Sequence, residues 1–494
     1  MSATDRGGAV PVMRGRLPFY YAGSVILLAL LLGGGTRQEL WSDKVVWLWA
    51  LPAVVVGFWR LPLSRLPTST RWLVVLVLAT LAVPLLPLGQ LTGAPDPAPL
   101  LLTADAGRTL ESVLHALVLL GFALFVAGFD DVRQERLLGF LLLGVLANMV
   151  AAATQLSYDR RAVEADLLPF VMTAGTMANE NHFATLCVLT IPVFAFLFLA
   201  RARRPLLYAA IAGLVVFLLF ALGSRAGMAA SVAAAFFCYV WFSGGMRISY
   251  PLLMTALIAA GLALLLPTLE PSLLGADLRV EIFERTRTLI GDVFPLGTGA
   301  GTFRNVYAAA LEAGDARPYF INHAHNDYLE ALLEWGWLMP LLLAPALIVL
   351  VRGALRSYLS GMAAIGVVIV LGHSAIDYPL RTLAVGVVFA YLFAIIASLR
   401  PAQPARRQEA ASLEAAPAIA HPAPLPEPVA AGAPAGGRAP LIDAQHDGRY
   451  LRSRLAVDAA PAVARSARDG AGRPRPARQG QHPTPVARQQ QGRP

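Results

Sequence analysis

Charged side chains are scarce in this chain of 494 residues. Asp, Glu, Lys and Arg together make up 14% of it, whereas apolar residues make up 56%. An ordinary soluble domain carries about 25% charged residues, so the composition excludes a large soluble enzyme. It also excludes disorder over the main body, because so much apolar surface has to be buried somewhere. The sequence therefore predicts a protein that resides in a lipid bilayer.

Cysteine and lysine are rare as well. Cys187 and Cys238 both lie in apolar runs, which favours buried thiols over a disulfide or a metal pair. The net charge of +9 comes from arginines that separate hydrophobic runs or fill the C-terminal region. They form no single basic patch, so we expect no nucleic-acid partner.

Long hydrophobic runs are what the sequence has in abundance. A helix needs about 20 apolar residues to span a bilayer, and about twelve candidates follow one another along the chain. They lie near residues 17–35, 45–59, 72–91, 109–128, 137–157, 182–200, 206–223, 226–243, 251–268, 330–351, 361–377 and 382–399. We therefore predict an all-α, polytopic integral membrane protein with about twelve transmembrane helices.

The arginines predict its orientation. They gather in alternate connections, for example at Arg133 and Arg136 and again at Arg352 and Arg356. The positive-inside rule places these connections and both termini in the cytoplasm.

Three segments surround or interrupt the predicted spans. Residues 1–16 are a predicted cytoplasmic N-terminus, and residues 17–399 form the membrane domain, in which residues 269–329 are a long loop on the outer side. Residues 400–494 are rich in Pro, Ala, Gly and Arg and poor in aromatic residues. This composition predicts a disordered cytoplasmic tail, either solvated or touching the headgroups of membrane lipids.

Arginines on the predicted outer face are candidates for function, because ionisable groups near membrane depth are costly. Arg225 follows Ser224 in a tight turn between two apolar runs, and Arg279 and Arg287 lie in the outer loop. The alternatives are that Arg225 extends to the interface and that Arg285 and Arg287 are surface charges paired with Glu281 and Glu284.

Histidines form the strongest polar cluster, within residues 322–330. His323 and His325 precede Asn326 and Asp327, and three interpretations are open. They are a metal site, for which a third ligand is not evident, a structural helix cap, and a general base. The ordinary pKa of histidine, about 6.5, suits proton transfer near neutral pH.

Three other features fall on the same face. Glu180 either orients a substrate or begins a helix as an acidic first-turn residue. Asp377 is expected to pair with Arg381 or to cap a turn. The glycines within residues 295–303 lack the preceding strand of a dinucleotide loop, which leaves a structural turn or a turn that approaches an anion.

An outer histidine beside arginines suits transfer from a diphosphate-activated donor. Guanidinium groups would hold the diphosphate through charge-assisted hydrogen bonds and stabilise it as it leaves. Histidine would take the proton of an attacking hydroxyl. We expect no cofactor and no metal. A transporter or flippase of lipid-linked sugars is the alternative, but it would need charges throughout a central cavity.

The same residues resemble the O-antigen ligase and O-antigen polymerase superfamily of bacterial membrane glycan transferases. The pair His325-Asn326, followed after nine residues by Gly336, is similar to the signature of that superfamily. Ser224-Arg225, Arg279 four residues before Phe283, and the glycine segment that leads to Phe303 are similar too. The resemblance covers about residues 175–380.

The resemblance implies a GT-C-like fold in the bacterial inner membrane and a periplasmic active site, which would make the loop 269–329 periplasmic. The donor would be a glycan on undecaprenyl pyrophosphate. The acceptor would be a hydroxyl of lipid A–core in a ligase, or a growing lipid-linked polysaccharide in a polymerase. His325 would activate the acceptor and Arg225 and Arg279 would bind the diphosphate. His323, Asn326, Glu180 and Arg287 complete the predicted substrate site.

Overall fold

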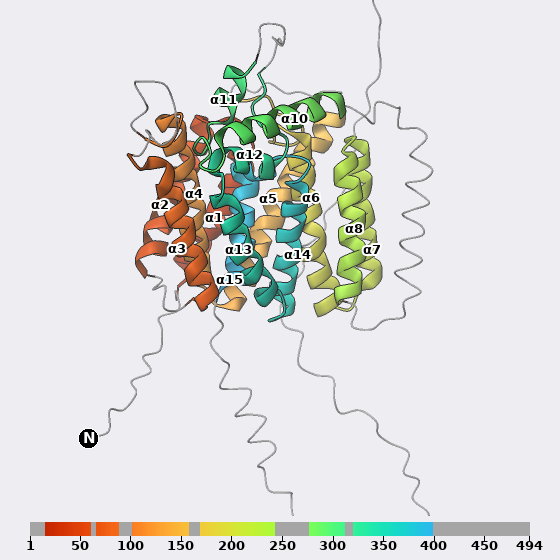
Figure 1. Cartoon of the computed structure of the whole chain (residues 1–494). Coiled ribbons are helices and arrows are strands. Elements are labelled where there is room, and N and C mark those ends of the chain that lie inside the picture. Colours follow the sequence, from red (N-terminus) through yellow and green to blue (C-terminus); the bar gives the residue numbers. More distant parts are fainter. Residues whose placement is uncertain are drawn as a thin grey trace, which may run out of the picture. The chain divides into compact units, whose positions relative to one another are not determined.

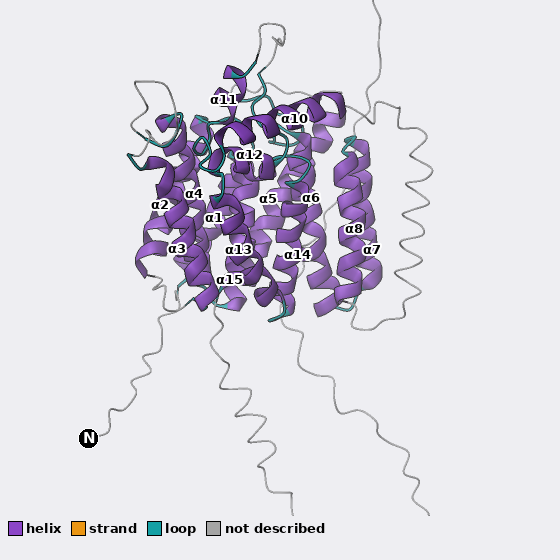
Figure 2. Cartoon of the chain, in the orientation of Figure 1, coloured by secondary structure: helices purple, strands orange, loops and turns teal. Residues whose placement is uncertain are grey.

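The computed structural model describes residues 15–60, 66–87, 101–157, 168–242, 276–311 and 320–398. Figure 2 shows helices and connecting loops in this part of the chain, and no β-strand is present in it. The all-α prediction is confirmed there. The predicted span at 251–268 and the predicted tail at 400–494 lie outside the described residues.

The helices follow one another with mostly short connections (Figure 1). The α-helices are α1 (Arg16–Leu32), α2 (Trp41–Arg60), α3 (Thr68–Ala82), α4 (Ala106–Ala127), α5 (Asp131–Ser157), α6 (Glu180–Ala195), α7 (Pro205–Ala221), α8 (Arg225–Phe242), α10 (Ala276–Val293), α11 (Phe303–Ala309), α12 (Asp327–Trp335), α13 (Leu338–Ala354), α14 (Tyr358–His373) and α15 (Leu383–Ala397). Short turns of other helix types are η2 (Val83–Leu85), η4 (Phe196–Arg201) and η8 (Pro379–Arg381).

Many of these helices are apolar enough for a bilayer. Five have the length and hydropathy of a membrane span, namely Trp41–Arg60, Thr68–Leu85, Ala106–Ala127, Asp131–Leu156 and Glu180–Arg201. Other apolar helices in the described part have 10–17 residues. A helix of 17 residues is about 26 Å long, slightly shorter than a hydrocarbon core of about 30 Å. The helices indicate a membrane protein, and a total of about twelve spans stays a prediction.

The bundle is organised around α15. This helix packs against α1, α4, α13 and α14, and most of its residues are buried, including Tyr391. Helix α6 packs between α8 and α14 and is largely buried as well. Apolar side chains on nearly all sides of α6 and α15 explain why both lie inside the bundle rather than at its surface.

Helices α10, α11 and α12 form a cap across one end of the bundle, at the top of Figure 1. The cap has a small hydrophobic core of its own, built from Ile282, Phe303, Tyr307, Ala324 and Leu333. Its helices hold the polar segment around residue 325 over the ends of α6 and α14.

One predicted span differs from the structure. The run at 330–351 was expected to be a single helix, but the chain breaks between α12 and α13 at Gly336, which has a φ of 52°. The backbone oxygen of Pro295 accepts a hydrogen bond from the N–H of Trp337 at 3.0 Å. A Cβ on Gly336 would overlap that oxygen. The Pro295 segment therefore lies against the chain at the break between α12 and α13, at a position that only glycine fits.

Candidate active site

Asp377 lies at the centre of the polar residues beneath the cap. It follows the end of α14, and its side chain is 1% exposed. One carboxylate oxygen, Oδ1, lies 3.2 Å from Nδ1 of His325 and accepts the backbone N–H of Tyr378 at 3.0 Å. The other, Oδ2, accepts the side-chain amide of Asn181 at 2.9 Å.

These partners keep Asp377 ionised. Burial by itself raises the pKa of a carboxyl group. The hydrogen bond from His325 and the nearby imidazole of His182 oppose this effect, and so does Arg279, whose Nη2 lies 3.8 Å from Oδ2. Together they hold the pKa of Asp377 well below its ordinary value. Of the two predictions for Asp377, a pair with Arg381 or a turn cap, the pair with Arg381 is wrong, because in the described structure its ion-pair partners are histidines and Arg279.

His325 has the geometry of an oriented base. A carboxylate only accepts hydrogen bonds, so Nδ1 carries the proton that faces Asp377, and in the neutral ring Nε2 then has a lone pair. The side chain is 30% exposed, and Tyr378 contacts the ring edge-on with centroids 4.9 Å apart. The backbone φ of His325 is 51°, an uncommon conformation for a residue other than glycine.

Two of the predicted arginines lie at the same end of the bundle. Arg279, on α10, also donates from Nη1 to the backbone oxygen of Ile376 at 3.2 Å, and its side chain is 42% exposed. The backbone of Arg225 begins α8. The preceding residue, Ser224, donates to the side chain of Asn181 at 3.3 Å, and Asn181 in turn contacts Asp377. The start of α8 and the His325–Asp377 pair thus share one hydrogen-bonded group.

His323 is fixed on both sides of its ring. Nδ1 lies 2.9 Å from a carboxylate oxygen of Glu330, and Nε2 lies 2.6 Å from the backbone oxygen of Thr36. Burial opposes a charge on this imidazole, but the Glu330 carboxylate outweighs burial and raises the pKa of His323. With both nitrogens bound within the protein, the ring holds the loop in place and leaves no nitrogen for a substrate.

Arg381 binds a row of three carboxylates on α12. Its Nη1 lies 2.8 Å from Glu334, and its Nε lies 3.5 Å from both Asp327 and Glu330. Burial raises the pKa of Asp327 to about 6 despite the nearby Arg381. Burial would also raise the pKa of Glu330, but Arg381 and His323 lower it to about 2. The network joins α12 to η8 and so fixes the segment that carries His325.

The remaining predicted residues have structural partners or lie at the surface. The side chain of Asn326 caps α12 through the N–H groups of Tyr328 and Leu329 and donates to the backbone oxygen of Ala375 at 2.8 Å. Arg287 pairs with Glu284 on the exposed face of α10. Glu180 is an exposed first-turn residue of α6.

The glycine segment is a structural turn. The backbone N–H groups of Thr298 and Gly299 donate to the carbonyls of Leu333 and Glu334 at 2.9 Å each. Both carbonyls lie in the last turn of α12, where backbone oxygens lack helical partners. These amides are therefore occupied by protein, and the segment caps α12.

Sequence reasoning missed Asn181 and the role of Arg381. A signal for Arg381 was available, because Asp327, Glu330 and Glu334 are spaced i, i+3, i+7 and lie on one helical face, which demands a cation when buried. For Asn181 we find no such signal, since its contacts with Ser224 and Asp377 join segments far apart in the sequence. Among the described residues, no group of three or more His, Cys, Asp or Glu is arranged to hold a metal ion.

Comparison with known families bears on this site. The sequence model of the O-antigen ligase family matches residues 209–344, a stretch that includes Arg225, Arg279 and His325. No curated protein matches the chain. The match agrees with the resemblance inferred from the sequence motifs: over residues 209–344 the chain is similar to the O-antigen ligase family, which supports that superfamily.

Proposed function

We propose that this protein is an O-antigen ligase. It transfers a glycan from undecaprenyl pyrophosphate to a sugar hydroxyl of lipid A–core on the periplasmic face of the bacterial inner membrane. The observation that carries the proposal is the His325–Asp377 pair, with Arg279 beside it, at one end of an apolar bundle. A membrane-bound donor can present its diphosphate at such an end.

His325 and Asp377 can account for the proton transfer that the reaction requires. His325 accepts the hydroxyl proton of the acceptor at Nε2, and the hydroxyl oxygen attacks the anomeric carbon of the donor glycan. The bond from that carbon to the diphosphate oxygen breaks, and undecaprenyl pyrophosphate leaves. Asp377 stabilises the imidazolium ion that forms, as it faces Nδ1 at 3.2 Å.

Arg279 and Arg225 bind the diphosphate in this proposal. Their planar guanidinium groups can each donate two parallel hydrogen bonds to phosphate oxygens. They neutralise the charge that grows on the leaving group, the task for which many other enzymes use a divalent metal ion. His323 and Asn326 act as positioning residues, because the protein already occupies their polar atoms.

Two alternative functions make different demands on the chain. A polymerase that joins lipid-linked repeat units would use the same donor and the same base, and only the acceptor would differ. A transporter or flippase is less well supported. The described interior of the bundle, along α6 and α15, is lined by apolar side chains, and the His325–Asp377 pair lies beyond the end of α14.

Deletion of the gene, followed by gel analysis of the surface glycan, tests the proposal. We expect lipid A–core without long chains, together with accumulated lipid-linked polymer, and recovery on expression of the wild-type chain. Retention of single-unit caps on lipid A–core would identify a polymerase instead. An unchanged glycan pattern would refute both transferase functions.

A further inference from the structure

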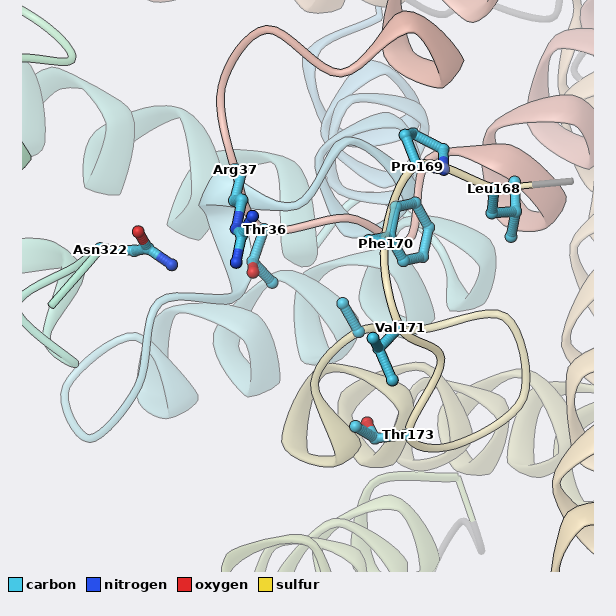
Figure 3. A pocket seen from close by; sticks show the side chains of 9 residues that line it. Thr36, Arg37, Leu168, Pro169, Phe170, Val171, Thr173 and Asn322 are labelled. Atoms are coloured by element: carbon cyan, nitrogen blue, oxygen red, sulfur yellow. The ribbon is translucent and has the colours of Figure 1, made fainter. Parts of the chain in front are cut away.

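A pocket of about 440 Å³ is lined by residues 36–37, by residues between 168 and 178, and by Asn322, which precedes His325 by three residues. Its volume falls within the range of about 300–1,000 Å³ found for small-ligand sites. Figure 3 shows Thr36 and Arg37 between Asn322 on one side and Phe170 and Val171 on the other. The pocket thus has an apolar wall from residues 168–171 and a polar wall that includes the positively charged side chain of Arg37.

The polar wall has unused binding capacity. Arg37 is exposed, and within the described parts of the chain its guanidinium has no ion-pair partner. The side chain of Asn322 likewise makes no hydrogen bond to described residues. A guanidinium prefers phosphate or carboxylate oxygens, and an amide beside it can bind hydroxyl groups. Phe170 offers a flat apolar surface to the C–H face of a sugar ring.

Three segments of chain connect the pocket with the surroundings of the catalytic pair. Thr36 lines the pocket, and its backbone oxygen holds His323 at 2.6 Å. Ala178 lines the pocket three residues before Asn181, which contacts Asp377. Asn322 lines it three residues before His325. A sugar held in the pocket would therefore lie close to the segment that carries the proposed base.

We propose that this pocket is a subsite for an anionic hexose of the acceptor glycan, with Arg37 binding its phosphate or carboxylate and Phe170 packing against its ring. The inference rests on the proposed function for the identity of the acceptor. Several polar side chains beside one cation suit a sugar with many hydroxyls better than a lipid headgroup, for which the arginine alone would suffice.

Binding of small probes tests the subsite without any turnover. The full-length protein in nanodiscs is titrated with glucose 6-phosphate and with glucuronate, and bound sugar is detected by saturation-transfer NMR. Glucose and inorganic phosphate serve as probes of the ring alone and of the charge alone. We expect Arg37→Ala to weaken binding of an anionic hexose by about tenfold or more, since a charge-assisted hydrogen bond is lost.

Arg304→Ala is the matched control. Arg304 lies on the cap over the ring of Phe320 and lines neither the pocket nor the catalytic pair, so this variant should bind as the wild type does. Equal binding by Arg37→Ala and wild type overturns the proposal. So does inorganic phosphate binding as tightly as the hexoses, or the absence of binding by both anionic hexoses.

Steady-state kinetics separate this inference from the proposed function. In the transfer reaction, Arg37→Ala should raise the KM for a phosphorylated acceptor by about tenfold and leave the KM for the donor unchanged. A rise in the donor KM instead would contradict an acceptor subsite. If the wild type transfers no glycan, the proposed function fails, whereas the binding result still decides whether the pocket holds an anionic hexose.

Discussion

Asp377 contacts most of the groups on which the proposed chemistry depends. It is buried, and its oxygens meet His325, Asn181 and Arg279 within 3.8 Å. A buried carboxylate without such partners would be strongly unfavourable. Asp377 therefore connects two tasks, because it orients the base and contacts one of the arginines assigned to the diphosphate.

Two arginines of α10, Arg279 and Arg287, give a matched test of diphosphate binding. Arg279 contacts Asp377, whereas Arg287 pairs with Glu284 at the surface. We expect Arg279→Lys to lower kcat/KM for the lipid-linked donor by about 100-fold, because one ammonium cannot reproduce the planar fork. Arg287→Lys should stay within about twofold of wild type, as expected for an exposed ion pair. Equal losses in both variants would contradict the assignment.

His323 should make stability depend on pH. Glu330 raises the pKa of His323 in the folded protein. The folded protein therefore holds the proton on this imidazole more tightly than the unfolded chain does. This contribution is fully present below pH about 6.5, the unfolded pKa, and is lost as the pH rises through the raised folded pKa. We expect the Tm of the wild type, measured by scanning fluorimetry, to fall across that window.

His323→Gln provides the comparison for this prediction. Glutamine retains a hydrogen-bond donor but has no proton to release, so its Tm should change less over the same pH range. A wild-type Tm that rises with pH there, or an identical slope in both proteins, would show that the His323–Glu330 pair does not carry the effect.

The sequence could indicate His325 and Arg279 but not how they are bound. Both stand out as ionisable residues in a chain poor in charge. The partner of Asp377 could not be inferred, because His325 lies 52 positions away and the nearer Arg381 offered an obvious opposite charge. Arg381 instead forms ion pairs with the three acidic residues of α12.

At the level of elements, the break between α12 and α13 sets the position of the cap. Apolarity alone predicted one helix over 330–351, since the contact at the break comes from Pro295, some 40 positions earlier. The hydrophobic pattern of residues 330–351 gives no sign of a contact with a residue so far away in the sequence. The glycine turn at 297–299 shows the same limit, because its amides bind the end of α12.

Gly336→Ala tests this break. The alanine would need a φ near 52° and would overlap the oxygen of Pro295, so we expect a loss of about 1–3 kcal/mol or more in stability. A lower Tm in a detergent-solubilised fluorescence assay would show it. Gly139→Ala is the control, because a Cβ there has open space within α5. Comparable Tm values for the two variants would contradict the proposed strain.

At the level of the whole molecule, composition alone indicated a helical membrane protein. The described helices agree with that prediction, but several are too short to identify as spans by length alone. Short helices still fit a bilayer that thins or a bundle whose neighbours cover their ends. Counting spans from sequence was therefore less certain than recognising the class.

The C-terminal region gives a test at the same level. The composition of residues 400–494 predicts a segment that folds no site of its own. Removal of residues 406–494 should leave the rate of glycan transfer by the purified protein within about twofold of the full chain. A loss of transfer with unchanged insertion in the membrane would mean that this region contributes to the reaction.

Glycan transfer by purified His325→Ala tests the central claim most directly. The variant and the wild type receive the same lipid-linked donor and acceptor, and His421→Ala, altered in the predicted tail, serves as a matched histidine control. We predict a transfer rate at least about 100-fold below wild type for His325→Ala, although the variant still unfolds cooperatively in scanning fluorimetry, and a normal rate for His421→Ala. Transfer by folded His325→Ala at the wild-type rate would contradict the account.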